Sequence, residues 1–173
     1  RGGCGGAGMI LDIEVSEPST DAEHTAFAEV DLAQLRALAD FAGARLHLGE
    51  EVELSLAVVT DEQMARLHRQ WMDLPGPTDV MSFPMDELRP GTAEDPAAGV
   101  LGDVVLCPTV AREQGERAGH GTADELCLLT VHGILHCLGY DHAEPEQERE
   151  MFGLQRRILE DFLGHPAPVE TRH

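Results

Sequence analysis

The feature that most constrains the fold of this chain is an apolar segment in its last third, residues 126–138, which carries two histidines. The segment reads LCLLTVHGILHCL, and its apolar side chains fall on every side of the helix that its length predicts. Because such a helix has no polar face to turn to water, other elements must enclose it. We therefore predict a central helix that Thr122 and Glu125 open at capping-box spacing and that Gly139 ends.

Two histidines on this helix, His132 and His136, are four residues apart, so their imidazoles project from one face about one turn apart. Gly139 permits the left-handed conformation that turns the chain back and brings His142 toward the same point. Three imidazoles and an open position are typical of catalytic rather than structural zinc sites. The spacing predicts one metal ion on these histidines, with zinc preferred, although nickel, copper and iron also accept imidazole. Five other histidines lack such spacing and are expected at the surface: His24, His47, His68, His120 and His165.

The spacing of His132, His136, Gly139 and His142 coincides with that of the metzincin metalloproteases, in which a glutamate directly after the first histidine is the general base. In this chain that position is Gly133. Without a carboxylate there, peptide hydrolysis loses a proton acceptor that contributes roughly a hundred- to ten-thousandfold. A metzincin-like zinc metallopeptidase with another base stays open as an alternative, and the general base is unassigned.

The rest of the chain predicts an α+β fold, a small mixed sheet of about four strands packed with about five helices. Alternating apolar residues predict strands over about residues 10–15, 51–60, 78–84 and 100–107, and prolines favour an edge position for the third. Helical spacing predicts further helices over about residues 26–42, 60–71, 109–118 and 146–163. We expect a single domain over residues 9–163, a loop over residues 89–99, a disordered glycine-rich extension over residues 1–8 and a loose tail over residues 164–173.

Composition excludes several classes of function. The chain has 32 acidic residues and 12 basic ones, all arginine, for a formal net charge of −20. A chain without lysine has no Schiff-base lysine, and this charge argues against a broad basic surface for duplex DNA or anionic lipid. No bilayer-spanning segment, signal pattern or paired cysteine spacing is present, so we expect a cytoplasmic protein with buried free thiols at Cys107, Cys127 and Cys137 and a further cysteine, Cys4, in the extension.

Three stretches of the sequence together resemble a known family. HGILHCLGYDH over residues 132–142 is similar to the signature of the bacterial YbeY endoribonucleases, PTDVMSFP over residues 77–84 to their second motif, and LGDV over residues 101–104 to their third. The resemblance extends over about residues 10–163. It implies an α+β fold, zinc on the three histidines, single-stranded RNA as substrate, and a role in small-subunit ribosomal RNA 3′-end maturation and ribosome quality control.

The sequence departs from this family at Met72, where many members carry an arginine thought to contact RNA. Arg69 and Arg66, on the same predicted helix, are candidates for that contact, and a solvated helix face explains them equally well. Asp141 and Asp103 are weak candidates for a catalytic role or for orienting a ligand, although a turn residue and a local cap would also account for them.

The charge of −20 predicts weak, salt-sensitive binding of RNA. The resemblance alone suggests the small ribosomal subunit as a partner that presents the RNA. A third hypothesis is a noncatalytic ribosome-binding factor whose metal is structural. Removing the metal separates this third hypothesis from the nuclease and the peptidase, because loss of a structural ion would unfold the protein, whereas loss of a catalytic ion should abolish activity and largely keep the fold.

Overall fold

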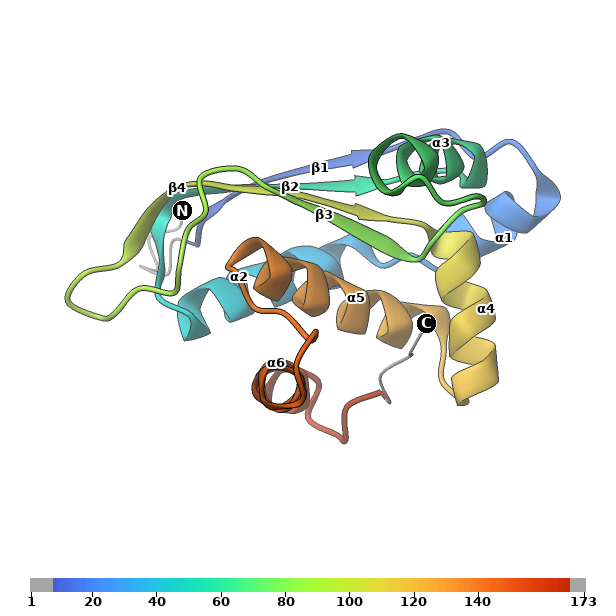
Figure 1. Ribbon diagram of the computed structural model, residues 1–173. Coiled ribbons are helices and arrows are strands. Elements are labelled where there is room, and N and C mark those ends of the chain that lie inside the picture. Colours follow the sequence, from blue (N-terminus) through green and yellow to red (C-terminus); the bar gives the residue numbers. More distant parts are fainter. Residues whose placement is uncertain (1–7, 169–173) are drawn as a thin grey trace.

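The computed structural model describes residues 8–168, so Cys4, most of the predicted disordered extension and the last five residues of the predicted loose tail lie outside the described residues. A four-stranded sheet has helices on both faces (Figure 1). In chain order the elements are β1 Ile10–Val15, α1 Asp21–Ala28, α2 Leu32–Arg45, β2 Leu48–Val58, α3 Asp61–Met72, β3 Val80–Pro84, β4 Ala97–Leu106, α4 Pro108–Ala118, α5 Thr122–Cys137 and α6 Pro145–Leu163. None of the helices in the described part of the chain combines enough length with enough apolar character to span a membrane.

The sheet is mixed, as predicted. Its strand order is β1-β2-β4-β3, in which β1, β2 and β4 run parallel and β3 pairs antiparallel with β4. The predicted edge position of β3 is confirmed, since this strand pairs only with β4. One long side of β3 is therefore open to whatever lies beside the sheet.

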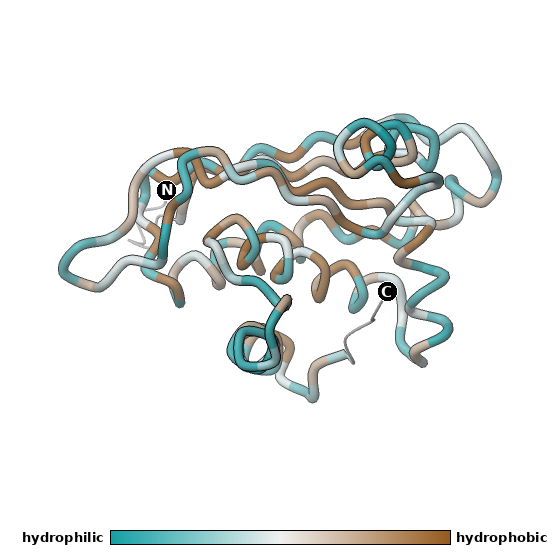
Figure 2. The backbone as a smooth tube through the Cα atoms, viewed as in Figure 1, coloured by the Kyte–Doolittle hydropathy of each residue, from teal (hydrophilic) through white to brown (hydrophobic). Residues whose placement is uncertain are grey.

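The core lies mainly between the sheet and the helices α2, α5 and α6. Figure 1 shows α2 and α5 against one face of the sheet and α3 on the other, and Figure 2 shows apolar residues concentrated along the sheet and α5. Leu126, Ile134 and Leu135 of α5 are at most 1% exposed. Burying each such side chain contributes roughly 1.5–3 kcal/mol. The predicted central, fully enclosed helix is confirmed.

The single helix predicted over residues 26–42 is wrong, because this region holds two helices, α1 and α2. Thr20 caps α1 in a capping box with Glu23, and Asp31 caps α2 by accepting a hydrogen bond from the Gln34 backbone N–H at 3.0 Å. Each polar side chain satisfies backbone donors that a continuous helix would have satisfied internally. The apolar spacing runs across the break and conceals it.

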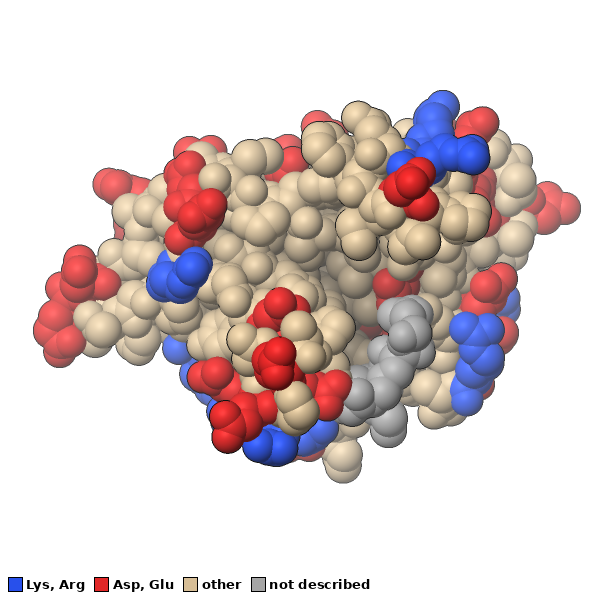
Figure 3. Space-filling model, viewed as in Figure 1, with Lys and Arg blue, Asp and Glu red and all other residues tan. Residues whose placement is uncertain are grey.

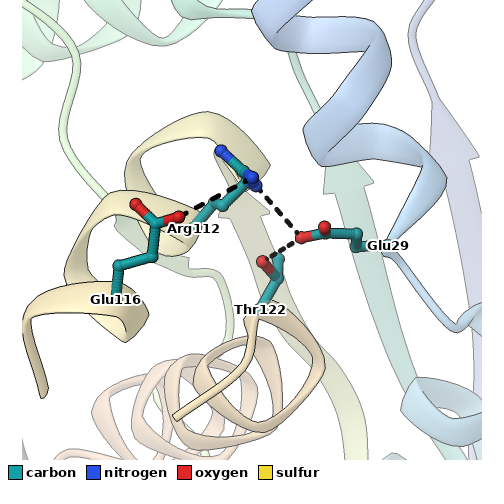
Figure 4. A network of polar contacts seen from close by, with 4 residues as sticks. All are labelled: Glu29, Arg112, Glu116 and Thr122. Atoms are coloured by element: carbon teal, nitrogen blue, oxygen red, sulfur yellow. Dashed lines mark hydrogen bonds and ion pairs between the residues drawn. The ribbon is translucent and has the colours of Figure 1, made fainter. Parts of the chain in front are cut away.

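The capping box predicted for the start of α5 is also wrong, since Gly121 is the N-cap and Thr122 is the first helical residue. Figure 4 shows what Thr122 does instead. Its hydroxyl donates to Glu29 Oε1 at 2.5 Å, and Arg112 Nε lies 3.3 Å from the same oxygen. Arg112 Nη2 also lies 3.6 Å from Glu116 Oε2. The start of α5 is thus tied to α4 and to the residue that follows α1.

Glu125, the other half of the predicted box, lies in a buried chain of polar groups. Its carboxylate is 0% exposed and contacts His120 Nε2. With its amide nitrogen facing both acids, Gln114 donates to Glu125 Oε2 at 3.1 Å and to Asp79 Oδ2 at 3.0 Å. The surface position predicted for His120 is therefore wrong, because its side chain is only 12% exposed.

The predicted free thiols are confirmed for Cys107, Cys127 and Cys137, which are buried and unpaired. Burial raises the pKa of each to about 12, so these groups are inert thiols at neutral pH. In the tail, Ala167 packs against the core and its N–H donates to Glu160 Oε2 at 3.4 Å.

Candidate metal centre

Three histidine side chains meet at the C-terminal end of α5. His132 and His136 come from the last turns of the helix, and His142 comes from the turn that follows it. One ligand atom from each ring lies within 4.8 Å of the other two. The ring centroids are 4.6 Å apart for His132 and His136, and 5.5 and 5.3 Å from these two to His142. The structure brings together the three histidines that the spacing predicted.

The turn after α5 is what places His142. Gly139 has φ 94°, in the left-handed region that favours glycine, and a Cβ there would lie 2.9 Å from Arg89 Cζ. The Tyr140 N–H returns to the Leu135 carbonyl at 3.0 Å, which closes the helix end. Asp141 Oδ1 accepts the His142 N–H at 2.7 Å, so this aspartate holds the turn that carries the third histidine.

A buried glutamine holds the ring of His132. Gln155 of α6 is 1% exposed, and its Oε1 lies 3.0 Å from His132 Nδ1. We assign the proton of this hydrogen bond to Nδ1, because the amide oxygen only accepts, and this leaves the Nε2 lone pair for a ligand. The sequence carried one signal for this role. Gln155 is a polar residue on the buried stripe of α6 that Met151 and Ile158 define.

Burial keeps the two helical histidines uncharged near neutral pH. The pKa of His132 falls to about 4, mainly because burial removes water from the ring and further because His136 and His142 repel a second positive charge, although the bond to Gln155 opposes this. The pKa of His136 is lowered by burial first and then by His142. Neutral imidazoles have lone pairs available, which is the state that a metal requires.

The histidines open onto a cleft of about 1030 Å³. Figure 3 shows this hollow on the face of the molecule between α3 and α6, with mostly uncharged residues around it. The walls come from the end of α3, the connection to β3, the open edge of β3, and the facing sides of α5 and α6. No arginine is among the described residues that line it, and the acids there are Asp79 and Glu148.

Gly133 explains why no glutamate follows the first histidine. A Cβ at this position would lie 2.7 Å from Val104 Cγ1 and 3.2 Å from Ser82 Oγ. Ser82 Oγ also donates to the Gly133 carbonyl at 3.3 Å, so α5 approaches the sheet at this point. Since position 133 faces the sheet at close contact, it has no room for the general base of a metzincin, and a metallopeptidase is not favoured.

The other candidates lie outside this cleft. Arg66 and Arg69 are exposed on α3 and do not line the cleft, whereas Met72 does. Asp103 pairs in register with Phe83, and the next residue, Val104, faces Gly133 of α5. Strand alternation places Asp103 on the opposite face of the sheet. RNA contact by the arginines and a catalytic role for Asp103 or Asp141 stay predictions.

The donor set fits a catalytic metal ion. Three imidazoles make up the cluster, and within the described residues it contains no cysteine and no fourth ligand of the histidine, cysteine or carboxylate type. His142 is exposed, so the side of the cluster that faces the cleft is accessible. Three histidine ligands with an accessible remaining position are the pattern of hydrolytic zinc sites.

Comparison with known proteins agrees with this arrangement. The family model of endoribonuclease YbeY matches residues 19–163. Curated proteins named endoribonuclease YbeY include one from Renibacterium salmoninarum, 53% identical over 88% of this chain and 98% of its own length. One from Micrococcus luteus is 61% identical over 74% of this chain and 82% of its own length. One from Beutenbergia cavernae is 57% identical over 84% of this chain and 97% of its own length.

A solved structure supports the fold alone. The solution structure of TM1509 from Thermotoga maritima superposes with a TM-score of 0.59 at 22% identity, over 90% of each chain. The family match, by contrast, covers the helix, turn and third ligand of the metal centre together with the strand beside it. On the strength of that match and of the relatives above 50% identity, the chain belongs to the YbeY endoribonuclease family.

Proposed function

We propose that this protein is a metal-dependent endoribonuclease that cleaves single-stranded RNA, and that its physiological substrate is ribosomal RNA during maturation of the small subunit. The observation that carries the proposal is the cluster of His132, His136 and His142 at the floor of an accessible cleft, in a chain of the YbeY endoribonuclease family. Zinc is the metal that we propose, because its catalytic sites favour three histidine ligands with a position left for water or substrate.

A zinc ion on these histidines would polarise a phosphate oxygen and lower the pKa of bound water to roughly 7. The chain itself supplies the orientation. Gln155 holds His132 in one tautomer, and Asp141 fixes the backbone of His142. Both bonds hold the ligands before substrate arrives, which is the preorganisation that a catalytic site needs.

The open edge of β3 offers one backbone donor along the same cleft, since the Val80 N–H donates to Asp79 Oδ1 and Pro84 has no N–H. Asp79 and Met85 bond to β4 at the two ends of the ladder, through Cys107 N–H to the Asp79 carbonyl at 3.0 Å and Met85 N–H to the Leu101 carbonyl at 3.2 Å. Because antiparallel ladders alternate, the even-numbered residues between them direct their backbone groups outward. The N–H of Ser82 is thus a donor that suits a phosphate oxygen of a strand lying along this edge.

The charge of the molecule favours a presented substrate. The net charge is −20, and no arginine lines the described walls of the cleft, so little of the binding free energy can come from neutralising phosphates. We infer that a partner, for which we propose the small ribosomal subunit in the cytoplasm, delivers the RNA strand to the cleft. Free RNA should bind weakly by comparison.

The test is cleavage of an end-labelled single-stranded RNA and of the same sequence as a duplex, by zinc-loaded, chelator-treated and zinc-restored protein. His142→Ala, purified identically, controls for contaminating nuclease, and because His142 is exposed we expect this variant to keep its fold. We expect cleavage of the single strand only, lost on chelation, regained with zinc and absent in the variant. Equal cleavage by the variant would overturn the proposal, and metal binding without any cleavage would favour the noncatalytic ribosome-binding factor.

A further inference from the structure

The only tryptophan of the chain lies uncovered at the rim of the cleft. Trp71, in the last turn of α3, is 59% exposed, although a large aromatic side chain is usually well buried. Its neighbours Met72 and Leu74 are also exposed, at 57% and 48%, and all three line the cleft. An apolar rim of this kind, beside a polar metal centre, marks a place where a ligand is bound.

Trp71 is held by a second aromatic ring, which also lines the cleft. Its ring meets Phe83 of β3 edge-on, with centroids 5.7 Å apart and planes at 68°. Phe83 directly follows Ser82, whose hydroxyl bonds to the Gly133 carbonyl beside the first metal ligand. The edge contact uses only part of the indole, and its exposed remainder lies in the same cleft as the three histidines.

The segment that carries Trp71 is fixed at both ends. His68 Nδ1 lies 2.9 Å from the Gly76 carbonyl, which ties α3 to the connection with β3. Asp73 ends α3 in the left-handed conformation, and its N–H returns to the Arg69 carbonyl at 3.0 Å. A ring on such a fixed rim binds a flat partner with little loss of conformational entropy.

The chemistry of the cleft then selects the kind of flat partner. Its described walls carry no arginine, so phosphate neutralisation cannot hold a strand there, and the exposed surface beside the metal centre is aromatic and apolar. Proteins bind single-stranded nucleic acids by stacking bases on aromatic rings, because every base has a flat π face. We propose that Trp71, supported by Phe83, is a nucleobase-binding subsite that stacks a base of the RNA strand whose phosphate lies at the metal centre. This inference rests on the proposed function and adds the residue that binds the base.

Because Trp71 is the only tryptophan, its fluorescence reports on the subsite directly. The probe is a 2′-O-methyl oligoadenylate added to zinc-loaded protein, and the control is an abasic oligonucleotide of equal length and charge. We expect the oligoadenylate to quench the fluorescence in a saturable way and the abasic strand to leave it nearly unchanged. Equal quenching by both strands, or none by either, would overturn the subsite.

Variants separate stacking from general packing. Stacking contributes roughly 1–3 kcal/mol per base, so Trp71→Leu should weaken oligoadenylate binding by about 5-fold to 150-fold, measured by anisotropy. The same variant should raise KM for RNA with kcat little changed. Trp71→Phe should recover most of the affinity, because it restores a ring. Ile10→Ala is the matched control, since Ile10 is 55% exposed on β1 at the opposite edge of the sheet. Affinity that is unchanged in Trp71→Leu would contradict the inference.

The two proposals fail in different ways. Cleavage of RNA with no base-dependent quenching and an unchanged KM in Trp71→Leu would remove the subsite and leave the nuclease in place. Base-dependent quenching without cleavage would keep the subsite and remove the nuclease. Quenching by an apolar peptide but not by the oligoadenylate would assign the rim to a protein partner and overturn the inference.

Discussion

Buried or half-buried histidines lie at both ends of α5, but their partners differ between the two ends. At the start of the helix, Glu125 is enclosed and its oxygens meet His120 and Gln114, so a basic ring and an acid satisfy each other. At the end of the helix, His132 and His136 face a third histidine instead of an acid. Half-buried histidines that disfavour one another's charged forms are an arrangement that stability alone does not favour.

The difference indicates which end acts on an external ligand. A polar network whose members pair with one another needs nothing from outside and contributes to the fold. The best partner for a cluster of three imidazoles is a metal cation, which has to come from outside the chain. We therefore assign stability to the start of α5 and function to its end, and each of the following changes tests that division.

The largest effect should come from removing one of the three histidines at the C-terminal end of α5. His136→Ala should lower RNA cleavage at least about a hundredfold, because the lost metal supplies several kcal/mol of transition-state stabilisation. The unfolding free energy of the metal-free variant should stay within about 1 kcal/mol of the wild type, because the ring that is removed is only half-buried and leaves no charged partner behind. Zinc content, cleavage rate and urea unfolding measure the three quantities. A variant that unfolds would show that the cluster is structural.

Removing the buried acid at the start of α5 should have the opposite result, a loss of stability with metal binding retained. Glu125→Ala leaves Gln114 and His120 without their buried acceptor, so the unfolding free energy should fall by about 3 kcal/mol while zinc binding to the folded variant is retained. Glu116→Ala is the control, because Glu116 also contacts a basic side chain, that of Arg112, but is exposed, and its loss should change stability by less than about 1 kcal/mol. Equal effects of the two substitutions in urea titrations would refute the division.

Low pH should lower the unfolding free energy of the metal-free protein through His132. The unfolded chain binds a proton at His132 near its ordinary pKa of 6.5, whereas the folded chain does so only near 4. Stability from the neutral ring is therefore complete above about pH 6.5 and is lost as the pH falls toward 4, by on the order of 3 kcal/mol. Urea unfolding across this range measures the loss. In His132→Phe the slope between pH 6.5 and 5 should flatten, and an unchanged slope would contradict the assignment.

The smallest effect should come from the contact between Thr122 and Glu29 at the start of α5. Thr122→Val removes the hydroxyl that donates to Glu29 and should lower the unfolding free energy by about 1 kcal/mol. Thermal unfolding can resolve this change, and Thr92→Val in the exposed loop before β4 serves as the comparison. A loss above about 3 kcal/mol would mean that the contacts in Figure 4 act as one cooperative unit with Glu125.

Periodicity and spacing predicted most of this fold because the features involved are local. The enclosed helix, the edge strand and the turn at Gly139 each follow from side chains within a few residues of one another. The same is true of the three clustered histidines, which lie within eleven consecutive residues, 132–142. The split between α1 and α2 was missed because apolar spacing continues across it, although Asp31 three residues before Gln34 was a usable signal.

The parts that could not be predicted depend on contacts between distant segments. Gln155 reaches His132 across 23 positions of sequence, and Thr122 reaches Glu29 across 93. The apparent capping box at Thr122 and Glu125 has the correct local pattern, but both side chains have partners elsewhere in the fold. Local spacing cannot rank such tertiary partners against a cap, and the same limitation hid the exposed position of Trp71 beside Phe83.

The most direct test of the division between the two ends of α5 is anomalous diffraction at the zinc edge from crystals grown with one equivalent of zinc. We expect one strong peak, bonded to an imidazole nitrogen of each of His132, His136 and His142, with any remaining ligand not supplied by a side chain. We also expect no peak at His120 and Glu125. A peak at His120 and Glu125, or a fourth side chain that coordinates the zinc at the three histidines, would contradict the division between the two ends of α5.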